Sequence, residues 1–329
     1  MANLLISRMI SSLLTLLLLS MIVFSMIHLA PGDPATLILP LDAKAEDVAE
    51  LRTALGLDRP IPVQYVLWLS KAMQLDFGRS YRSELPAVKM FLNRLPASLE
   101  LALGAILLAV ASSVPMGLFA AIKRGTWWDF STSFVSLIGL SAPRFWVGII
   151  LILIFSLSLR WFPVFGRDIG LFHGIYRLFE GDFASIYQAV ICLVLPATAL
   201  ATWSSAIFLK HTRANVIEEL DKLYVKTARE KGIGEKRVIL FHIIRNACIP
   251  VITIIALNTG RLIGGAVIVE TVFAWPGVGQ LLINALWSRD YPVIQANICI
   301  VGVIITSIFF FMDIIYMAID PRIRSKTMA

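Results

Sequence analysis

The stretch MISSLLTLLLLSMIVFSMI, residues 9–27, contains nineteen residues and no charged side chain. A membrane-spanning helix needs about 20 mostly apolar residues, because the hydrocarbon core is about 30 Å thick and a helix rises about 1.5 Å per residue. Signal peptides have a shorter apolar core of about 7–15 residues and a small-residue cleavage motif. No A-x-A motif follows this stretch. We therefore expect residues 1–30 to form a retained N-terminal transmembrane helix.

Five further stretches are long and apolar enough to cross a bilayer. Three of them contain no charged residue, namely 101–122, 189–209 and 291–312. The other two, 130–159 and 246–269, reach the required length only by including Arg144 and Arg261, respectively. The sequence thus predicts an all-α integral membrane protein with six transmembrane helices.

The composition excludes the main alternatives to a membrane protein. Hydrophobic residues make up 58% of the chain and charged residues 16%, against about 45–50% and about 25% in globular proteins. Two soluble domains could not bury this much apolar surface, and disordered chains are poor in aliphatic residues. The three cysteines lie separately inside apolar runs, which argues against a disulfide scaffold.

The charges of the loops predict the orientation, because Lys and Arg are retained on the cytoplasmic side. Residues 210–245 carry nine basic and five acidic side chains, whereas residues 31–95 carry eight of each and residues 160–187 carry three of each. We therefore expect both termini to be cytoplasmic. The net charge of +7 then reflects membrane topology. No basic stretch interleaves with base-stacking aromatics, so nucleic acid is not an expected partner.

The chain divides into four parts on this basis. Residues 1–30 form the first helix, and residues 31–95 form an extracytoplasmic, partly helical segment. In that segment a helix over residues 43–55 is predicted to end at Gly56, and a second begins at residues 60–62 and runs through Met73. The membrane core is expected within 96–319, and residues 320–329 form a cytoplasmic tail.

Motifs for catalysis, nucleotides and metals are missing from the sequence. It contains no G-x-x-x-x-G-K-[ST] loop, no G-x-S-x-G elbow and no H-E-x-x-H pair. The four histidines have no metal-ligand spacing with any cysteine. The intramembrane carboxylates Glu100, Glu270 and Asp313 lie on different expected spans. We expect no enzymatic activity, no cofactor and no metal site.

The 210–245 loop contains a predicted helix–turn–helix elbow at residues 222–236. Its sequence LYVKTAREKGI, residues 223–233, places helix formers before Gly232, and a second basic helix follows. The glycine is expected to adopt a left-handed conformation. A short exposed helix of this kind suits docking into a groove on a soluble partner. The alternative is a solvated basic loop that only fixes the topology.

This elbow resembles the coupling motif of ABC-importer permeases, specifically of the oligopeptide/dipeptide/nickel permease family. The family's D-Y-x-x-T-A-R-x-K-G pattern is matched at Tyr224, Thr227, Ala228, Arg229, Lys231 and Gly232. Leu223 stands where the family has an acidic residue, which leaves open how polar contacts are made at that end of the helix.

Further segments resemble the same family in the same order along nearly the whole chain. They are PGDP at 31–34, GGAV at 264–267, ETVF at 270–273, WPG at 275–277, RDYPVIQ at 289–295 and DPRIR at 320–324.

The resemblance implies the type I fold of ABC importers and a place in the bacterial cytoplasmic (inner) membrane. It implies as partners a second, non-identical permease subunit, two cytosolic ATPase subunits and an extracytoplasmic solute-binding protein. The elbow would transmit closure of the ATPases into rocking of the helices. The implied ATPase-coupling residues are Tyr224, Lys226, Thr227, Ala228, Arg229, Lys231, Gly232, Arg245, Asn246 and Pro250.

Charged residues inside the membrane are candidates for the translocation pathway, because they are costly there and usually face a cavity or a partner. We assign Arg144, Arg261 and Glu270 to the pathway as a hypothesis. Glu270 could instead lie near the headgroups, and Arg144 could snorkel because Pro143 breaks the helix before it. Arg261 lies fifteen residues into its stretch, about 22 Å along a helix, too deep to reach either surface easily.

Small residues in the same stretch predict close helix packing. Gly260 and Gly264 are four residues apart, and Gly265 follows directly. Together they would leave one helix face flat enough for a neighbouring span to approach.

Three functional readings remain open at this level. The family reading is import of di- or oligopeptides, with nickel or a nickel chelate as the alternative cargo. A secondary transporter without an ATPase would often show inverted repeats and paired broken helices, and no such symmetry is found. A membrane-anchored interaction protein would act through residues 31–95.

Overall fold

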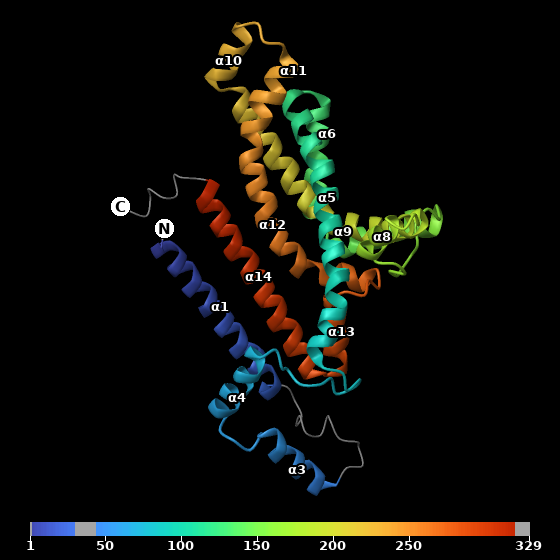
Figure 1. The fold of residues 1–329 in the computed structure, drawn as a ribbon. Coiled ribbons are helices and arrows are strands. Elements are labelled where there is room, and N and C mark those ends of the chain that lie inside the picture. The colour runs from blue at the N-terminus through green and yellow to red at the C-terminus, as the bar shows by residue number, and fades with distance from the viewer. Residues whose placement is uncertain (1, 30–43, 320–329) are drawn as a thin grey trace. The chain divides into compact units, whose positions relative to one another are not determined.

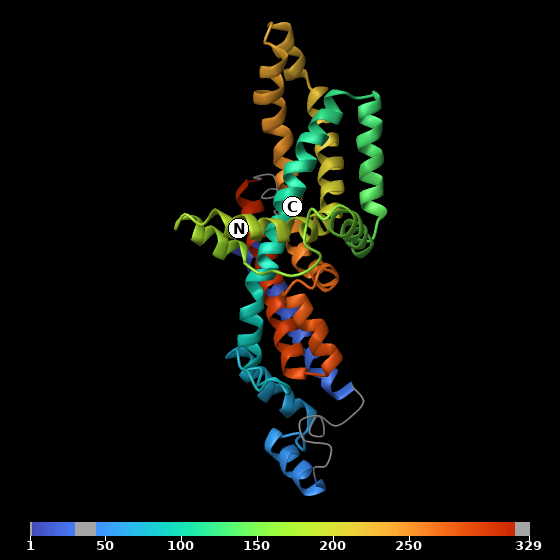
Figure 2. The ribbon, with the colours of Figure 1, turned by 90° about the vertical axis from the view of Figure 1, so that its right-hand side faces the viewer.

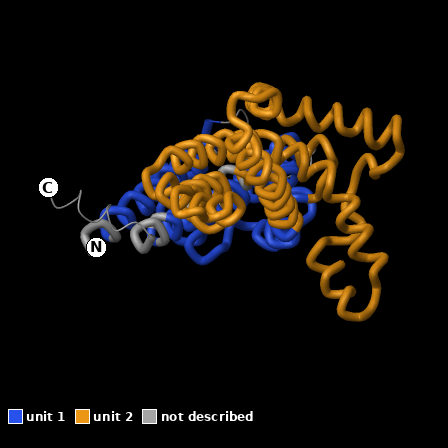
Figure 3. Tube along the Cα trace, turned by 90° about the horizontal axis from the view of Figure 1, so that it is seen from above, with its two compact units in different colours: residues 1–96, 277–329 blue, residues 97–276 orange. Residues whose placement is uncertain are grey.

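The computed structural model describes residues 2–29 and 44–319. The motifs at 31–34 and 320–324 therefore lie outside the described residues. Some side chains inside helices are also outside the description, at positions 2–5, 27, 51, 54, 55, 249, 261, 263, 265, 313 and 315–319. The chain forms two compact units, residues 1–96 with 277–329 and residues 97–276 (Figure 3).

Four helices of the described part are long and apolar enough to cross a membrane without interruption. They are α1 (Ala2–Leu29), α5 (Ala87–Ile122), α9 (Phe183–Leu220) and α14 (Tyr291–Ile319) (Figure 1). Two bent segments raise the number of candidate spans to six if each counts as one. The expected all-α fold is thus confirmed.

The first bent segment covers the stretch expected at 130–159. Here α6 (Trp127–Ser141) is followed by α7 (Arg144–Leu151) and the π-helix η1 (Ile152–Ser158), and the direction changes by 108°. The cause is Pro143, which lacks a backbone N–H and forces the preceding residue out of the helical region. Ala142 accordingly has ψ 126°. The predicted break is confirmed, and the stretch is not one straight helix.

The second bent segment runs from α11 (Glu235–Arg237) through the π-helix η2 (Val238–Ile243) into α12 (Ile244–Val272). Its two parts, Glu235–Cys248 and Pro250–Gly260, differ in direction by 43°. The bend falls at Pro250, because a proline inside a helix removes one hydrogen bond of the ladder and kinks the helix.

The first unit combines α1, α13 (Val278–Ser288) and α14 with two short helices, α3 (Ala45–Leu55) and α4 (Ile61–Met73). The predicted end of α3 is confirmed, since Gly56 has φ +70°. α4 packs against α1, and the Trp68 indole N–H donates to Gln295 Oε1 on α14 over 2.9 Å. The segment around α3 and α4 is therefore partly helical, as expected.

A buried carboxylate ties the loop before α5 to the start of α14. Asp290 accepts a hydrogen bond from Ser80 Oγ over 2.5 Å and one from the Tyr81 backbone N–H over 3.2 Å. Burial, and then the charge of Asp290, raise the pKa of Tyr81 to about 12. Tyr81 therefore stays neutral throughout the physiological range.

The second unit is built around α5, α6, α9 and α12, and Figure 2 gives a second view of these helices. The buried face of α6 carries small and polar residues: Asp129, Thr132, Ser136 and Gly139. Its exposed face carries large apolar residues, including Trp127, Phe130, Phe134 and Leu137. This arrangement is the reverse of a soluble helix and suits a lipid environment, where helices associate through small residues and interhelical hydrogen bonds.

Glycines and one ion pair set how closely the other helices approach α9. A Cβ at Gly104 would lie 2.9 Å from Leu193 Cδ2, and a Cβ at Gly117 would lie 2.8 Å from the Leu209 carbonyl oxygen. The Arg213 guanidinium donates two hydrogen bonds to Asp129, over 2.5 and 2.8 Å. Bidentate pairs of this kind fix geometry as well as charge.

We predict that Gly117→Val destabilises the protein by about 1–3 kcal/mol, because the new side chain would have to displace backbone of α9. Thermal unfolding of the detergent-solubilised protein measures the effect. Gly234→Ala is the control, since a Cβ at Gly234 meets nothing within 4 Å. Equal melting temperatures for Gly117→Val and the natural protein would contradict the observed approach of α5 to α9.

Candidate functional site

The expected elbow is present in the structure. It consists of α10 (Leu223–Glu230), a turn at Gly232 and the start of the bent segment from α11 (Figure 1). Gly232 has φ +76°, which confirms the predicted left-handed conformation. A Cβ at this glycine would meet nothing within 4 Å. A larger residue would therefore be opposed by backbone strain and not by crowding.

Apolar contacts attach α10 to the ends of the two long helices that flank it. Val225 and Ala228 are the buried residues of α10. They belong to a cluster that includes Val216 of α9 together with Val238 and Ile243 of η2. The elbow is therefore packed as a continuation of α9 and α12, and it is not a solvated loop.

Polar contacts of Tyr224 reinforce this attachment. Its hydroxyl donates to the carboxylate of Glu219 at the end of α9 and accepts from Asn246 Nδ2 of α12 over 3.0 Å. The hydroxyl also lies 3.2 Å from the carbonyl oxygen of His242 in η2. Burial, and then hydrogen bonding to Glu219, raise the pKa of Tyr224. The neutral phenol thus joins three segments.

Glu219 supplies a carboxylate beside Tyr224, where Leu223 stands in place of the acidic residue of the family pattern. Leu223 is 80% exposed and contributes no carboxylate. Glu219 instead pairs with the Lys222 ammonium as well as with Tyr224, and it raises the pKa of Lys222. Sequence reasoning missed Glu219 because it lies on the preceding helix, across a turn that no single-helix spacing rule covers.

A second ion pair closes the Gly232 turn. The Arg229 guanidinium donates to both carboxylate oxygens of Glu235, over 3.1 and 2.6 Å. This pair raises the pKa of Arg229. The predicted residues Lys226, Thr227 and Lys231 are exposed. The elbow thus has an internally bonded frame and an outward face with basic side chains.

The remaining coupling residues lie in α12. Arg245, Asn246 and Pro250 are all exposed. Asn246 is brought to the elbow through Tyr224, as described above. Pro250 marks the bend of α12, one turn beyond Asn246.

The expected pathway residues are distributed over α7 and α12. Arg144 is half-buried at the first position of α7, and its guanidinium carbon lies 5.4 Å from the centre of the Trp203 ring of α9. Such a cation–π contact favours a defined position for the charge. Glu270 is fully buried and accepts a hydrogen bond from Ser98 Oγ over 2.6 Å. Arg261 lies in α12, but its side chain is outside the described residues.

The predicted small-residue face of α12 is described in part. Gly260 is buried and Gly264 is exposed, whereas Gly265 lies outside the described side chains. Close packing of a neighbouring span on this face stays a prediction.

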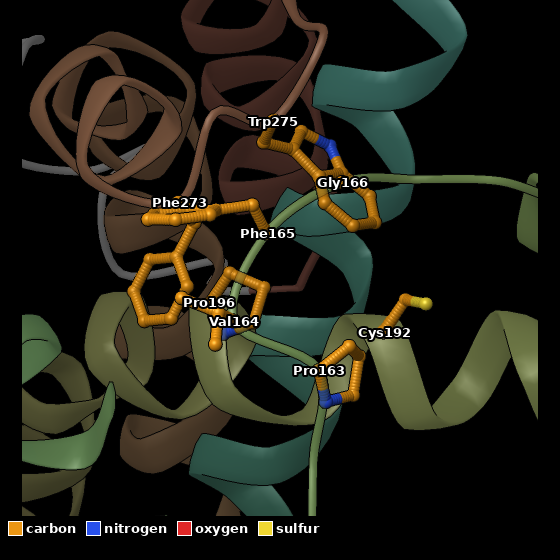
Figure 4. Close-up of a pocket in the computed structure, with 8 residues that line it drawn as sticks. All are labelled: Pro163, Val164, Phe165, Gly166, Cys192, Pro196, Phe273 and Trp275. Carbon is orange, nitrogen blue, oxygen red and sulfur yellow. The ribbon is translucent and has the colours of Figure 1, made fainter. Parts of the chain in front are cut away.

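A junction of hydrogen bonds near Glu270 holds the part of α5 at residues 97–100. The Trp275 indole N–H donates to the Ala97 carbonyl over 2.8 Å. The Arg167 guanidinium donates to both oxygens of the buried Glu100 over 2.7 and 2.8 Å, and the backbone N–H of Phe172 donates to the same carboxylate. Figure 4 shows the labelled residues 163–166, Cys192, Pro196, Phe273 and Trp275 gathered at this junction.

The described residues offer no metal centre. Among them, no group of three or more His, Cys, Asp or Glu side chains is placed to hold a metal ion.

Comparison with known families gives two matches that together cover most of the chain. Residues 1–102 match the N-terminal family of binding-protein-dependent transport system membrane components. Residues 113–325 match the family described as binding-protein-dependent transport system inner membrane component.

Curated relatives are similar over almost their full lengths. The dipeptide transport system permease protein DppB of Alkalihalophilus pseudofirmus is 38% identical over 93% of this chain and 94% of its own length. The oligopeptide transport system permease protein AppB of Bacillus subtilis is 38% identical over 98% of this chain and 100% of its own. The glutathione transport system permease protein GsiC of Escherichia coli is 37% identical over 99% and 100%.

We predict that Tyr224→Phe loosens the elbow, because Glu219 and Asn246 lose a shared hydrogen-bond partner at a cost of about 0.5–1.5 kcal/mol. Hydrogen exchange in lipid nanodiscs measures this as faster exchange of the amides of α10 and η2. Tyr187→Phe is the control, since this tyrosine is 67% exposed on the same long helix α9. Unchanged exchange in both variants would show that the Tyr224 contacts do not hold the elbow.

Proposed function

Because the chain belongs to the inner membrane permease components of binding-protein-dependent ABC transport systems, we propose that it forms half of the translocation path of a peptide importer. As a member of this family it is a membrane-spanning permease subunit of the bacterial inner membrane. The relatives named above transport dipeptides, oligopeptides and glutathione. These cargoes share a peptide backbone with charged ends, and this similarity supports the peptide class for this chain.

A subunit of this family works with a solute-binding protein, an ATPase and a partner permease. The finer composition that we propose is a heterodimer of two permease chains with two ATPase subunits. The absence of a P-loop motif from the sequence supports placing ATP hydrolysis entirely in the partners. In this proposal the chain itself catalyses no reaction. The excess of basic residues at 210–245 supports a cytoplasmic position for the elbow and both termini.

The observation that carries the mechanism is the attachment of the elbow to two helix ends. α10 presents an exposed face to the cytosol, which suits a groove on the ATPase. Its opposite face is fixed to α9 and α12 through Val225, Ala228 and Tyr224. A displacement imposed on α10 would therefore move α9 and α12 together, which supports conversion of ATPase closure into alternating access.

The pathway proposal rests on the broken segment between α6 and α7. Non-helical backbone inside a membrane is tolerated where it is enclosed by protein or lines an aqueous cavity. Arg144 begins α7 directly after this break. A guanidinium suits bidentate contact with the carboxylate of a peptide. We therefore keep Arg144 as a pathway residue, together with Arg261 and Glu270.

We predict that Gly232→Val abolishes coupling while the protein still inserts in the membrane. A β-branched residue with positive φ is strained by about 1–3 kcal/mol, so the turn would reshape and shift α10. The measurement is ATP-dependent uptake of a radiolabelled dipeptide by proteoliposomes containing the complete transporter. Uptake by the natural complex tests the proposed function, and the variant should lose at least about nine-tenths of it.

Gly234→Val serves as the matched control for this variant, because Gly234 lies two residues away with φ −59°. A Gly232→Val complex with normal uptake and a full complement of ATPase subunits would contradict the role of the elbow.

We predict that Arg261→Leu leaves the complex assembled but lowers dipeptide uptake, because the pathway loses a cation that can pair with the peptide carboxylate. A guanidinium inside the bilayer costs at least about 2.5–3.5 kcal/mol, so a position facing lipid is disfavoured. Arg261→Lys should restore part of the uptake. Unchanged uptake in the leucine variant would remove Arg261 from the pathway.

A further inference from the structure

A cavity of about 380 Å³ lies between α5, α6 and α9. The cavity lies, along α5, between two points of close contact with α9, at Gly104 and Gly117. The volume is at the small end of the range of about 300–1,000 Å³ that is usual for small-molecule sites.

Hydroxyl groups from all three helices line this cavity: Ser112, Ser113, Ser136, Thr198, Thr202 and Ser205. The first five donate their hydrogens to backbone carbonyls. The acceptors are Leu108 at 2.7 Å, Ala109 at 2.5 Å, Ala206 at 3.0 Å, Val194 at 2.7 Å and Thr198 at 2.9 Å, in the same order. Ser205 has no hydrogen-bond partner within the part of the chain that the structure describes.

These hydrogen bonds determine what the cavity can recognise. A hydroxyl has one hydrogen and two acceptor lone pairs, so a hydroxyl that donates to a carbonyl can only accept from a ligand. No charged side chain lines the cavity among the described residues. The lining therefore offers acceptors for N–H groups and no charged partner for either an ammonium or a carboxylate.

Apolar residues make up much of the lining, among both its buried and its exposed members. Ala201 and Ala206 are buried together with Ser113 and Ser136, and Leu108 is exposed. A ligand would thus meet hydroxyl oxygens set within an apolar wall. A short peptide with apolar side chains offers N–H groups and apolar surface together.

We propose that this cavity binds the ammonium and amide N–H groups of a peptide in passage. The proposal rests on the proposed peptide import and adds a site within the permease.

The first experiment measures access to the cavity in the complete transporter. Ser205→Cys is introduced after Cys192, Cys248 and Cys299 have been replaced by alanine in a complex that still transports. Its modification rates are compared for a cationic aminoethyl and an anionic sulfonatoethyl methanethiosulfonate. At Ser205→Cys we expect the ratio of the cationic to the anionic modification rate to be about ten times the ratio at a control cysteine. Excess dipeptide together with binding protein should slow the cationic reaction at position 205.

The control cysteine is Tyr187→Cys, at an exposed position of the same helix. It should show neither the preference for the cation nor protection by dipeptide. Failure of both reagents to modify position 205 would show that lipid or a helix of the partner permease fills the cavity, and this would overturn the proposal.

The second experiment removes one acceptor without changing the volume. Thr202→Val should lower dipeptide uptake about tenfold, and Thr202→Ser should retain most of it. Thr15→Val on α1 is the matched control, because Thr15 makes the same type of bond to the carbonyl four residues earlier, over 2.8 Å. Normal uptake by Thr202→Val would overturn the cavity proposal, whereas absence of uptake by the natural complex would instead refute peptide import.

Discussion

The shared contact of Tyr224 with Glu219 and Asn246 is the interaction on which the functional account depends. It joins the end of α9, the short helix α10 and the start of α12 through one hydroxyl group. Val225 and Ala228 add an apolar attachment to the same helices. Without these contacts α10 would be joined to α9 and η2 only through the chain. A displacement of α10 would then not have to move the two long helices. With them, direct contacts join α10 to the ends of the two long helices, and we propose that the three move together.

The membrane imposes the second constraint, because apolar surface gains little by being buried in a protein that is surrounded by lipid. Packing in the 97–276 unit accordingly combines an apolar cluster with glycines and with polar contacts such as the pair of Asp129 and Arg213. The same constraint explains the hydroxyl-lined cavity. Five of its six serines and threonines donate their hydrogen to a backbone carbonyl, and this leaves oxygen lone pairs available for a ligand.

Much of the fold follows from local sequence. Apolar length predicts the spans, Gly56 and Gly232 predict two left-handed turns, and Pro143 predicts the break before Arg144. These features are local because a proline or glycine acts on its own backbone. The size of the change in direction after Pro143 does not follow from sequence, since neighbouring helices decide where the chain goes next.

The contacts that hold the site together are less accessible from sequence. Glu219 and Tyr224 meet across a turn, and Glu100 meets Arg167 over a separation of 67 residues. No spacing rule connects such pairs. The cavity was not predicted either, because its hydroxyls come from three helices and each residue alone is ordinary in a membrane span. The resemblance to peptide permeases identifies the elbow, but it does not show which residues support it.

The central claim is that α10 moves as one body with the Leu220 end of α9. The direct test is a distance distribution by double electron–electron resonance between nitroxides at exposed positions 210 and 227, in the complete transporter with and without ATP. The account predicts one narrow distribution that is unchanged by nucleotide. A shift or broadening of this distance on ATP binding would show that the elbow moves independently of α9, and it would contradict the account.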